Sequence, residues 1–292
     1  MSAQGGLSVE RMCQLAQVSR AGFYRSLREQ APQQEETELR GRIQEIVVEN
    51  RRRYGIRRVA AQLRAEGRVV NRKRVARIMR EDNLLAVRQR RFVVTTDSEH
   101  EHTVYFNLAG RMQLTGINQL WVADITYIRL QGEFVYVAVI LDAYSRKVIG
   151  WELDRSLQTR LTIAALLKAI EQRDPPPGIV HHSDRGVQYA SPDYLEVLHA
   201  HGMVPSMSRA GCPYDNAACE SFMKTLKQEE IYATQYQDLE DLREHLEEFL
   251  EQYYNCHRLH SALKYQTPAS FEANLAALTA ESRAAKIEFS EA

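Results

Sequence analysis

The spacing of apolar residues predicts helices in the first third of the chain. Val59 and Leu63 lie four positions apart on one helix face, and Gly67 ends that helix as a C-cap. A second helix presents another apolar face, made of Val75, Ile78 and Met79. Glutamines and acids at residues 32–38 predict a linker, after which a further helix begins around Ile43. We therefore expect a small all-α module.

The first 30 residues also show helical spacing. The stretches "SVERMCQLAQ" and "VSRAGFYRSLR" predict a short pair of helices, the second capped by Ser19. Such a pair is a helix-turn-helix-like segment. A role in DNA binding and a purely structural role account for it equally well.

A different pattern begins near residue 119. β-branched and aromatic residues joined by short turns predict an antiparallel meander at residues 119–130, 133–145 and 146–153. Helices are then expected at 159–173, 191–201, about 213–232 and 238–254, with strands at 178–183 and 203–207. This order predicts an α/β fold in which helices cover both faces of a mixed five-stranded sheet, as in an RNase-H-like core.

These patterns divide the chain into five parts. They are a helix-turn-helix-like segment (1–35), a basic helical module (36–92), a linker (93–115), an RNase-H-like core (116–275) and a C-terminal tail (276–292).

The composition of the chain also indicates where in the cell the protein is found. Apolar residues make up 44% of the 292, enough for a core, yet no stretch approaches the roughly 18 to 20 apolar residues of a membrane span. The N-terminus "MSAQGGLSVERMCQ" lacks the apolar centre of a signal peptide. We expect a cytoplasmic protein that does not contact a membrane.

The net charge of zero hides a strong asymmetry. Residues 40–91 hold seventeen Arg or Lys against five acids, a net charge of +12 that the rest of the chain offsets. A solvated face normally mixes signs, and this segment hardly does, so we expect it to contact the phosphates of a nucleic acid. The candidate DNA-binding residues here are Arg57, Arg58, Arg72, Lys73, Arg74 and Arg77.

Three carboxylates stand out in the second part of the chain. Asp124 lies in a strand that should be buried, where a lone carboxylate needs a partner such as a metal ion. Asp184 follows the fourth strand directly, and Glu220 lies on a later helix, on the same face as Asn216, Lys224 and Lys227. Oxygen ligands of this kind suit Mg²⁺, and lysines beside them suit backbone phosphates.

Long stretches of the sequence resemble one known family. The motifs "WVADITYI", "HHSDRGVQYAS", "SMSRAGCPYDNAACESFMKTLKQE" and "YYNCHRLHSALKYQTP" are similar to those of integrase-type DDE transposases of bacterial insertion sequences. The match is best to the catalytic protein that the second of two overlapping reading frames encodes. It extends in order from about Val9 to Phe271, and it implies a retroviral-integrase-type core.

The resemblance implies a role for individual residues. Asp124, Asp184 and Glu220 match the family's catalytic, metal-binding triad, with 35 residues between the last two and Lys227 in the basic position seven residues after Glu220. Two Mg²⁺ ions are expected, which Mn²⁺ can replace. Asn216 matches the family's "DNA" element ahead of the glutamate.

Other matched residues have two interpretations. His182 and Arg185 either orient Asp184 or touch DNA, or else they serve the turn and the strand end. For the motif from Tyr254 to His260 we favour packing of the last helix against the core over DNA contact.

The resemblance implies a DNA transposase that cleaves element ends and joins the freed 3′-hydroxyl to target DNA. A hydrolytic nuclease of the same fold is one alternative, and a DNA-binding regulator of transposition, not fused to the upstream frame, is another. The partners implied are element ends and target duplex, further copies of the chain on DNA, and the upstream-frame protein.

Overall fold

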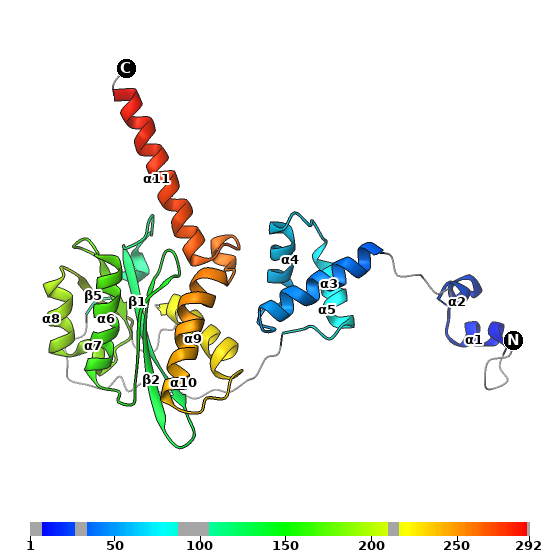
Figure 1. Ribbon diagram of the computed structural model, residues 1–292, viewed down its shortest axis with the longest axis horizontal. Coiled ribbons are helices and arrows are strands. Elements are labelled where there is room, and N and C mark those ends of the chain that lie inside the picture. The colour runs from blue at the N-terminus through cyan, green and yellow to red at the C-terminus, as the bar shows by residue number, and fades with distance from the viewer. Residues whose placement is uncertain (1–7, 27–33, 87–104, 210–215, 291–292) are drawn as a thin grey trace. The chain divides into compact units, whose positions relative to one another are not determined.

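The computed structural model describes residues 8–26, 34–86, 105–209 and 216–290 (Figure 1). It separates into two compact units, Met1–Val87 and Arg88–Ala292. Most of the expected linker, and the expected helix start near residue 213, lie outside the described residues.

The first unit begins with the expected pair of short helices, α1 (Val9–Leu15) and α2 (Arg20–Ser26). The Ser19 hydroxyl accepts a hydrogen bond of 3.0 Å from the Gly22 amide, so the predicted cap is confirmed.

Three further helices follow: α3 (Gln34–Glu49), α4 (Ile56–Ala65) and α5 (Arg72–Glu81). They pack around a shared apolar core, whose fully buried members include Ile43, Ile46, Val59, Leu63, Val75, Ile78 and Met79. The linker predicted at residues 32–38 is wrong from Gln34 onward, because that segment forms the first turns of α3. Ion pairs from Glu35 and Glu36 to α5 hold it in place, and these long-range partners are invisible to a local pattern.

The second unit contains the predicted mixed five-stranded sheet in the order β3-β2-β1-β4-β5. The strands are β1 (Leu120–Arg129), β2 (Phe134–Asp142), β3 (Val148–Asp154), β4 (Val180–Ser183) and β5 (Val204–Met207). β1, β2 and β3 form the antiparallel meander, and β4 and β5 run parallel to β1. β4 therefore points in the same direction as β1 and ends beside the middle of that longer strand.

Helices cover both faces of this sheet (Figure 1). On one side lie α6 (Thr159–Arg173), the four-residue α7 (Val187–Ala190), which the pattern did not predict, and α8 (Pro192–Ala200). On the other lie α9 (Ala217–Leu226), which continues into a π-helical turn η3 (Lys227–Ile231), and α10 (Leu239–Glu247), which continues into the π-helix η4 (Glu248–His257). Two single 3₁₀ turns, η1 (Ala109–Arg111) and η5 (Ser261–Leu263), complete the connections.

The last helix, α11 (Pro268–Ser290), extends away from the sheet (Figure 1). The expected boundary between core and tail at residue 276 falls inside it. Across the described ranges, no helix has the length and apolar character needed to cross a membrane.

Two contacts fix the helices on the edge strand β3. Gly150 faces α6 so closely that a Cβ there would lie 2.4 Å from the Ala165 carbonyl oxygen. On the other side the Asn255 side-chain amide of η4 both donates to the Val148 carbonyl and accepts from the Val148 amide, each at 2.9 Å. The amide thus takes the place that a neighbouring strand would have.

Candidate active site

Strand pairing brings two of the predicted carboxylates together. In the parallel ladder Trp121 pairs with His181 and Val122 with His182. Two residues further along, Asp124 on β1 and Asp184, the first residue after β4, occupy equivalent positions on the same face. Neighbouring strands lie about 4.8 Å apart, so the two carboxylates are side by side.

Helix α9 adds the third carboxylate. Its buried face consists of Cys219, Phe222, Met223 and Leu226, and this face packs toward the sheet, where α9 contacts β1. Glu220 is exposed on another face of the same helix. The buried Asn216, the N-cap of α9, donates from its side-chain amide to the Ala123 carbonyl at 3.1 Å, which ties the start of α9 to the residue before Asp124.

The charges of these groups act on one another. Burial and the carboxylate of Asp184 raise the pKa of Asp124 to about 7, and Glu220 adds to this rise. A hydrogen bond of 2.8 Å from the Ile125 amide and the charge of Lys227 oppose it. Asp124 therefore lies within the field of both other carboxylates, which is the condition that a divalent cation would relieve.

Lys227 lies at the junction between α9 and the π-helical turn. Its ammonium nitrogen is 5.4 Å from the ring centroid of Tyr127 on β1, and the lysine is partly buried. Burial lowers the pKa of Lys227, while Asp124 acts in the opposite direction. Lys224, one turn earlier, is exposed. Of the two predicted lysines, Lys227 is therefore the one that the fold holds beside the carboxylates.

The described residues include no group of three His, Cys, Asp or Glu side chains arranged to hold a metal ion. The donor set nevertheless suits a hard cation, since it consists of carboxylate oxygens. Two buried polar atoms nearby, Asn216 Oδ1 and the Tyr189 hydroxyl, have no hydrogen-bond partner among the described residues. Tyr189 lies within the electrostatic range of both aspartates. Unsatisfied oxygens beside repelling carboxylates fit a site that takes up a hydrated cation.

The turn after β4 orients Asp184. Its carboxylate accepts a hydrogen bond of 2.9 Å from the Gly186 amide, and a Cβ at Gly186 would lie 3.0 Å from that same oxygen. His182 is buried, with its two ring nitrogens 2.8 Å and 3.0 Å from the hydroxyls of Ser206 and Ser208. Arg185 donates to the Ser208 carbonyl at 2.8 Å. Both residues thus fasten the Asp184 turn to β5 and its end, which favours the structural interpretation.

The motif from Tyr254 to His260 packs behind α9. The rings of Tyr254 and Phe222 meet edge to face with centroids 4.9 Å apart, and those of Tyr254 and His260 at 4.8 Å. These contacts agree with the interpretation that we favoured from the sequence, in which this motif packs its helix against the core.

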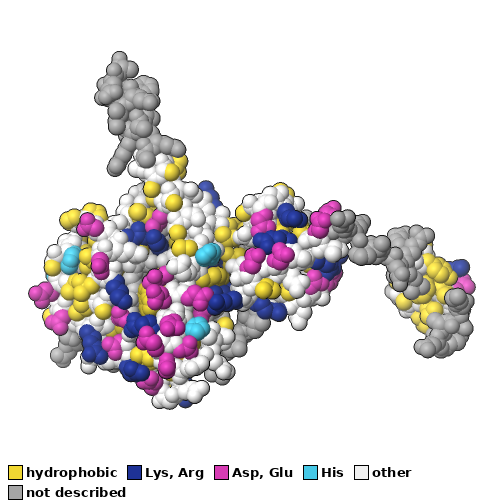
Figure 2. Space-filling view, in the orientation of Figure 1, with side chains coloured by type: hydrophobic (Ala, Val, Ile, Leu, Met, Phe, Trp, Pro, Cys, Tyr) yellow, Lys and Arg dark blue, Asp and Glu magenta, His cyan; other side chains and the backbone are white. Residues whose placement is uncertain are grey.

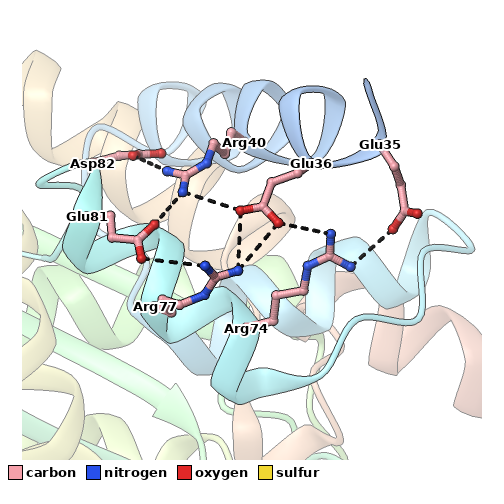
Figure 3. Close-up of polar contacts among 7 residues, drawn as sticks. All are labelled: Glu35, Glu36, Arg40, Arg74, Arg77, Glu81 and Asp82. Atoms are coloured by element: carbon pink, nitrogen blue, oxygen red, sulfur yellow. Dashed lines mark hydrogen bonds and ion pairs between the residues drawn. The ribbon is translucent and has the colours of Figure 1, made fainter. Parts of the chain in front are cut away.

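The basic module does not present the surface of one sign that the charge count predicted. Figure 2 shows acidic side chains among the basic ones on its visible face, and Figure 3 shows how they pair. Glu36 on α3 lies 3.4 Å from Arg74 and 3.3 Å from Arg77, both on α5. Arg74 also pairs with Glu35 at 3.1 Å, and Arg40 binds Glu81 and Asp82 at the end of α5.

The other predicted DNA-binding residues lie in different surroundings. The Arg58 guanidinium is 5.6 Å from the ring centroid of the buried Tyr54. Arg57, Arg72 and Lys73 are exposed and form no ion pair within the described ranges. Full positive charge is therefore presented at the beginnings of α4 and α5.

Two residues near the site were missed by the sequence analysis. The ring of Tyr127 lies against the Lys227 ammonium, and the buried Tyr189 is near enough to both aspartates for their charges to raise its pKa. Tyr189 is part of the quoted "HHSDRGVQYAS" motif, five positions after Asp184, so its place in that motif was the available signal. Tyr127 likewise lies in the quoted "WVADITYI" motif, three positions after Asp124.

Comparisons with known proteins agree with this architecture. Residues 115–213 and 201–268 match models of an integrase core domain, and residues 33–92 match a model of an HTH-like domain. Among solved structures, the chain is similar to the HTLV-2 integrase catalytic core domain in complex with magnesium, with a TM-score of 0.40 and 17% identity over 53% of this chain and 97% of that one.

Curated relatives extend the match to most of the chain. A 31 kDa protein of insertion element IS600 from Shigella sonnei is 36% identical over 89% of this chain and 97% of its own length. The transposase InsF of insertion sequence IS3A from Escherichia coli is 35% identical over 92% of this chain and 95% of its own length. With an HTH-like module, an integrase core and relatives of this similarity along almost its full length, the chain belongs to the family of insertion-sequence transposases that includes InsF of IS3A.

Proposed function

We propose that the chain catalyses the two strand reactions of DNA transposition at Asp124, Asp184 and Glu220. The observation that supports this most directly is the parallel register of β1 and β4, in which Val122 pairs with His182 and each aspartate follows two residues later. Helix α9 contacts β1 beside them and bears Glu220. In the first reaction a water oxygen attacks the phosphorus at an element end and the P–O3′ bond breaks. In the second the freed 3′-hydroxyl attacks a target phosphodiester, whose own 3′-oxygen leaves with a proton.

The three carboxylates would hold Mg²⁺, two ions in our proposal, with Mn²⁺ as a substitute. When bound, the metal supplies activation of the attacking oxygen and stabilisation of the leaving oxygen. The raised pKa of Asp124 and the unpartnered Asn216 Oδ1 support a site that is completed by a cation and its waters.

The two lysines at the end of α9 and the start of η3 would contact DNA phosphates. Lys227, held over Tyr127 and close enough to feel the charge of Asp124, would bind a phosphate next to the reacting one. Lys224 is exposed one turn away and would contact the backbone further along the strand. Both contacts orient DNA without reading its sequence.

In the first unit we propose that Arg57, Arg72 and Lys73 contact DNA phosphates. They are exposed and form no ion pair within the described part of the chain, whereas Arg74 and Arg77 share Glu36. DNA would have to compete with that carboxylate for the two arginines, so we give them a smaller share of the binding energy.

Transposition joins two element ends to one target, so we propose that several copies of the chain act together on DNA in the cytoplasm. The upstream-frame protein is a further proposed partner, and His182 and Arg185 are proposed to support the Asp184 turn through Ser208.

A strand-transfer assay tests the proposal. A labelled duplex copied from the end of the encoding insertion sequence is incubated with the chain, plasmid target and Mg²⁺ or Mn²⁺. Asp124→Asn, Asp184→Asn and Glu220→Gln should each abolish cleavage and joining without weakening DNA binding. Asp193→Asn, an exposed aspartate on α8, is the matched control and should keep full activity. Cleavage without joining would indicate a nuclease, and absence of any strand reaction with either metal would indicate a regulator.

A further inference from the structure

A buried arginine lies against the back of the helix that bears Glu220. Arg258, 6% exposed, follows η4 directly and donates two hydrogen bonds to the Glu229 carboxylate, at 2.8 Å and 2.9 Å. Glu229 lies in the π-helical turn, two residues after Lys227, and also accepts a hydrogen bond of 3.3 Å from the Tyr253 hydroxyl. A bidentate pair of this kind fixes both distance and orientation.

The same guanidinium also reaches α9 itself. One of its nitrogens donates to the Thr225 hydroxyl at 3.2 Å, and that hydroxyl donates to the Ser221 carbonyl at 3.0 Å. Ser221 is the neighbour of Glu220 in the chain. A chain of hydrogen bonds therefore runs from Arg258 to the backbone beside the candidate metal ligand.

Helix geometry shows on which side of α9 Arg258 makes this contact. Thr225 is five positions after Glu220, which at about 100° per residue places it roughly 140° around the helix from that carboxylate. Arg258 therefore holds α9 from behind, on the side away from Glu220. The arginine is itself held in place, because its guanidinium carbon lies 5.5 Å from the Tyr254 ring centroid and one nitrogen is 3.4 Å from His260 Nε2.

We propose that Arg258 is a positioning residue, which fixes the rotation of α9 through Thr225 and Glu229 and thereby places Glu220 and Lys227 opposite Asp124. The proposal rests on the function proposed above. Arg258 touches no reacting atom in this role. It acts on the reaction only through the helix that it holds.

The energetics of buried ion pairs favour a role beyond stability. Removing two charges from water costs so much that apolar residues of similar size often stabilise a fold equally well. An apolar pair, however, lacks the directional hydrogen bonds that determine how a helix is turned about its axis. The π-helical form of the turn, a feature common at functional sites, places Glu229 where the arginine can reach it.

The test separates stability from positioning. Arg258→Met leaves the buried Glu229 carboxylate without its positively charged partner, and the double variant Arg258→Met with Glu229→Met removes both charges. We expect the double variant to melt within about 3 °C of the wild type. Its kcat for strand transfer should nevertheless be lower by about 100-fold, as for a catalytic group displaced by about 1 Å, with KM for DNA unchanged.

Two more variants sharpen the comparison. Arg258→Lys keeps the charge but cannot serve Glu229 and Thr225 together, so it should regain stability and only part of kcat. Thr225→Val removes the link to Ser221 and should lower kcat by about 10-fold with little change in melting temperature. Thr279→Val is its matched control, because Thr279 makes the same hydrogen bond to a carbonyl four residues earlier, on α11. Its kcat should not change.

Hydrogen exchange of the α9 amides gives a readout that does not depend on activity. The double variant should exchange faster at residues 217–226 while β1 and β2 stay protected. A double variant with wild-type kcat, or with wild-type exchange in α9, overturns the positioning role. If the wild-type chain itself shows no metal-dependent strand transfer, the proposed function fails, and the exchange measurement still decides whether Arg258 holds α9.

Discussion

The side-chain amide of Asn216 donates a hydrogen bond of 3.1 Å to the carbonyl of Ala123, so the N-cap residue of α9 is joined directly to the strand residue before Asp124. This bond crosses 93 positions of sequence. It fixes the end of α9 nearest to Glu220, whereas Arg258 contacts the other end.

Replacing Asn216 with Ala should therefore leave a buried carbonyl unpaired. The free energy of unfolding of the second unit should fall by about 1–3 kcal/mol. Urea denaturation followed by tryptophan fluorescence measures this unit alone, because both tryptophans, Trp121 and Trp151, lie in it. Ser221→Ala, an exposed change on the same helix, should have almost no effect, and an equal loss in both variants would contradict the importance of the hydrogen bond.

Gly150 is the point where α6 rests on β3. A Cβ at this position would lie 2.8 Å from Ala169 Cβ as well as close to the Ala165 carbonyl, so Gly150→Ala must push the helix away from the sheet. We expect a loss of about 1–3 kcal/mol in the same urea experiment. Gly116→Ala meets nothing closer than 3.8 Å and is the control. A Gly150→Ala variant as stable as this control would show that α6 can move without cost.

The stability of the second unit should depend on pH through His181. Burial and the neighbouring His182 lower the pKa of His181 to about 3. Its Nε2 lies 3.0 Å from the Tyr194 hydroxyl, with the Tyr189 ring next to it. The unfolded chain takes up a proton near pH 6.5 and the folded chain does not, so stability is complete above pH 6.5. His181 alone should contribute a loss of about 1.4 kcal/mol for each pH unit between 6.5 and 3. The raised pKa of Asp124 acts in the opposite direction between about 7 and 3.8, so the contribution of His181 is the difference between the wild type and a His181 variant.

Denaturation curves at several pH values check this dependence. His181→Gln should lower the slope of stability against pH in that window, although it also loses some stability at neutral pH. His199→Gln, an exposed histidine on α8, should keep the full slope. An unchanged slope in His181→Gln would assign the acid sensitivity to other groups.

The ion pairs of the basic module predict unequal contributions to DNA binding. Arg72→Gln or Lys73→Gln should each reduce the slope of log affinity against log salt by about 0.9, the value for one lost phosphate contact. Arg74→Gln and Arg77→Gln should reduce it less, because Glu36 already pairs with both. Glu36→Gln should increase affinity. Fluorescence anisotropy with a labelled duplex at several KCl concentrations measures these slopes, with Gln44→Ala as an exposed neutral control.

Equal losses for Arg72 and Arg74 would contradict this ranking and would show that DNA displaces Glu36 freely. A weaker binding by Glu36→Gln would instead show that the carboxylate is needed to hold the two arginines in place.

The composition of the strands and the turns between them were sufficient to predict the sheet and the positions of the two aspartates in the sequence of its strands. The run of β-branched and aromatic residues that follows Trp121, and the position of Asp184 directly after a short apolar strand, are features of consecutive residues, so they can be recognised in the sequence. The four-residue helix α7 was missed because one turn is too short to show a period. The start of α3 at Gln34 was missed for a related reason, since a stretch with almost no apolar residues has no apolar face that would indicate a helix.

The partners of charged residues could not be predicted in this way. The count that gave +12 began at residue 40 and therefore left out Glu36, although its partners Arg74 and Arg77 lie inside the counted range. Arg258 had a place in a recognised motif, but its contact with Glu229 across 29 positions depends on the turn between them. Pairing between distant charges is set by tertiary structure, which the charge pattern alone does not contain.

Because Glu220 and Glu229 lie on one continuous helical segment that ends in the π-helical turn Lys227–Ile231, the number of residues between them determines how the two side chains are oriented. Deleting a single residue between Glu220 and Lys227, in the α-helical part, would rotate the helical residues that follow by about 100° around the axis relative to Glu220. Glu229 would then point away from Arg258. Between Glu220 and Glu229 the exposed positions should therefore accept substitutions more readily than the segment accepts insertions or deletions, since the number of residues sets the angle between the Glu220 carboxylate and the Glu229 contact with Arg258.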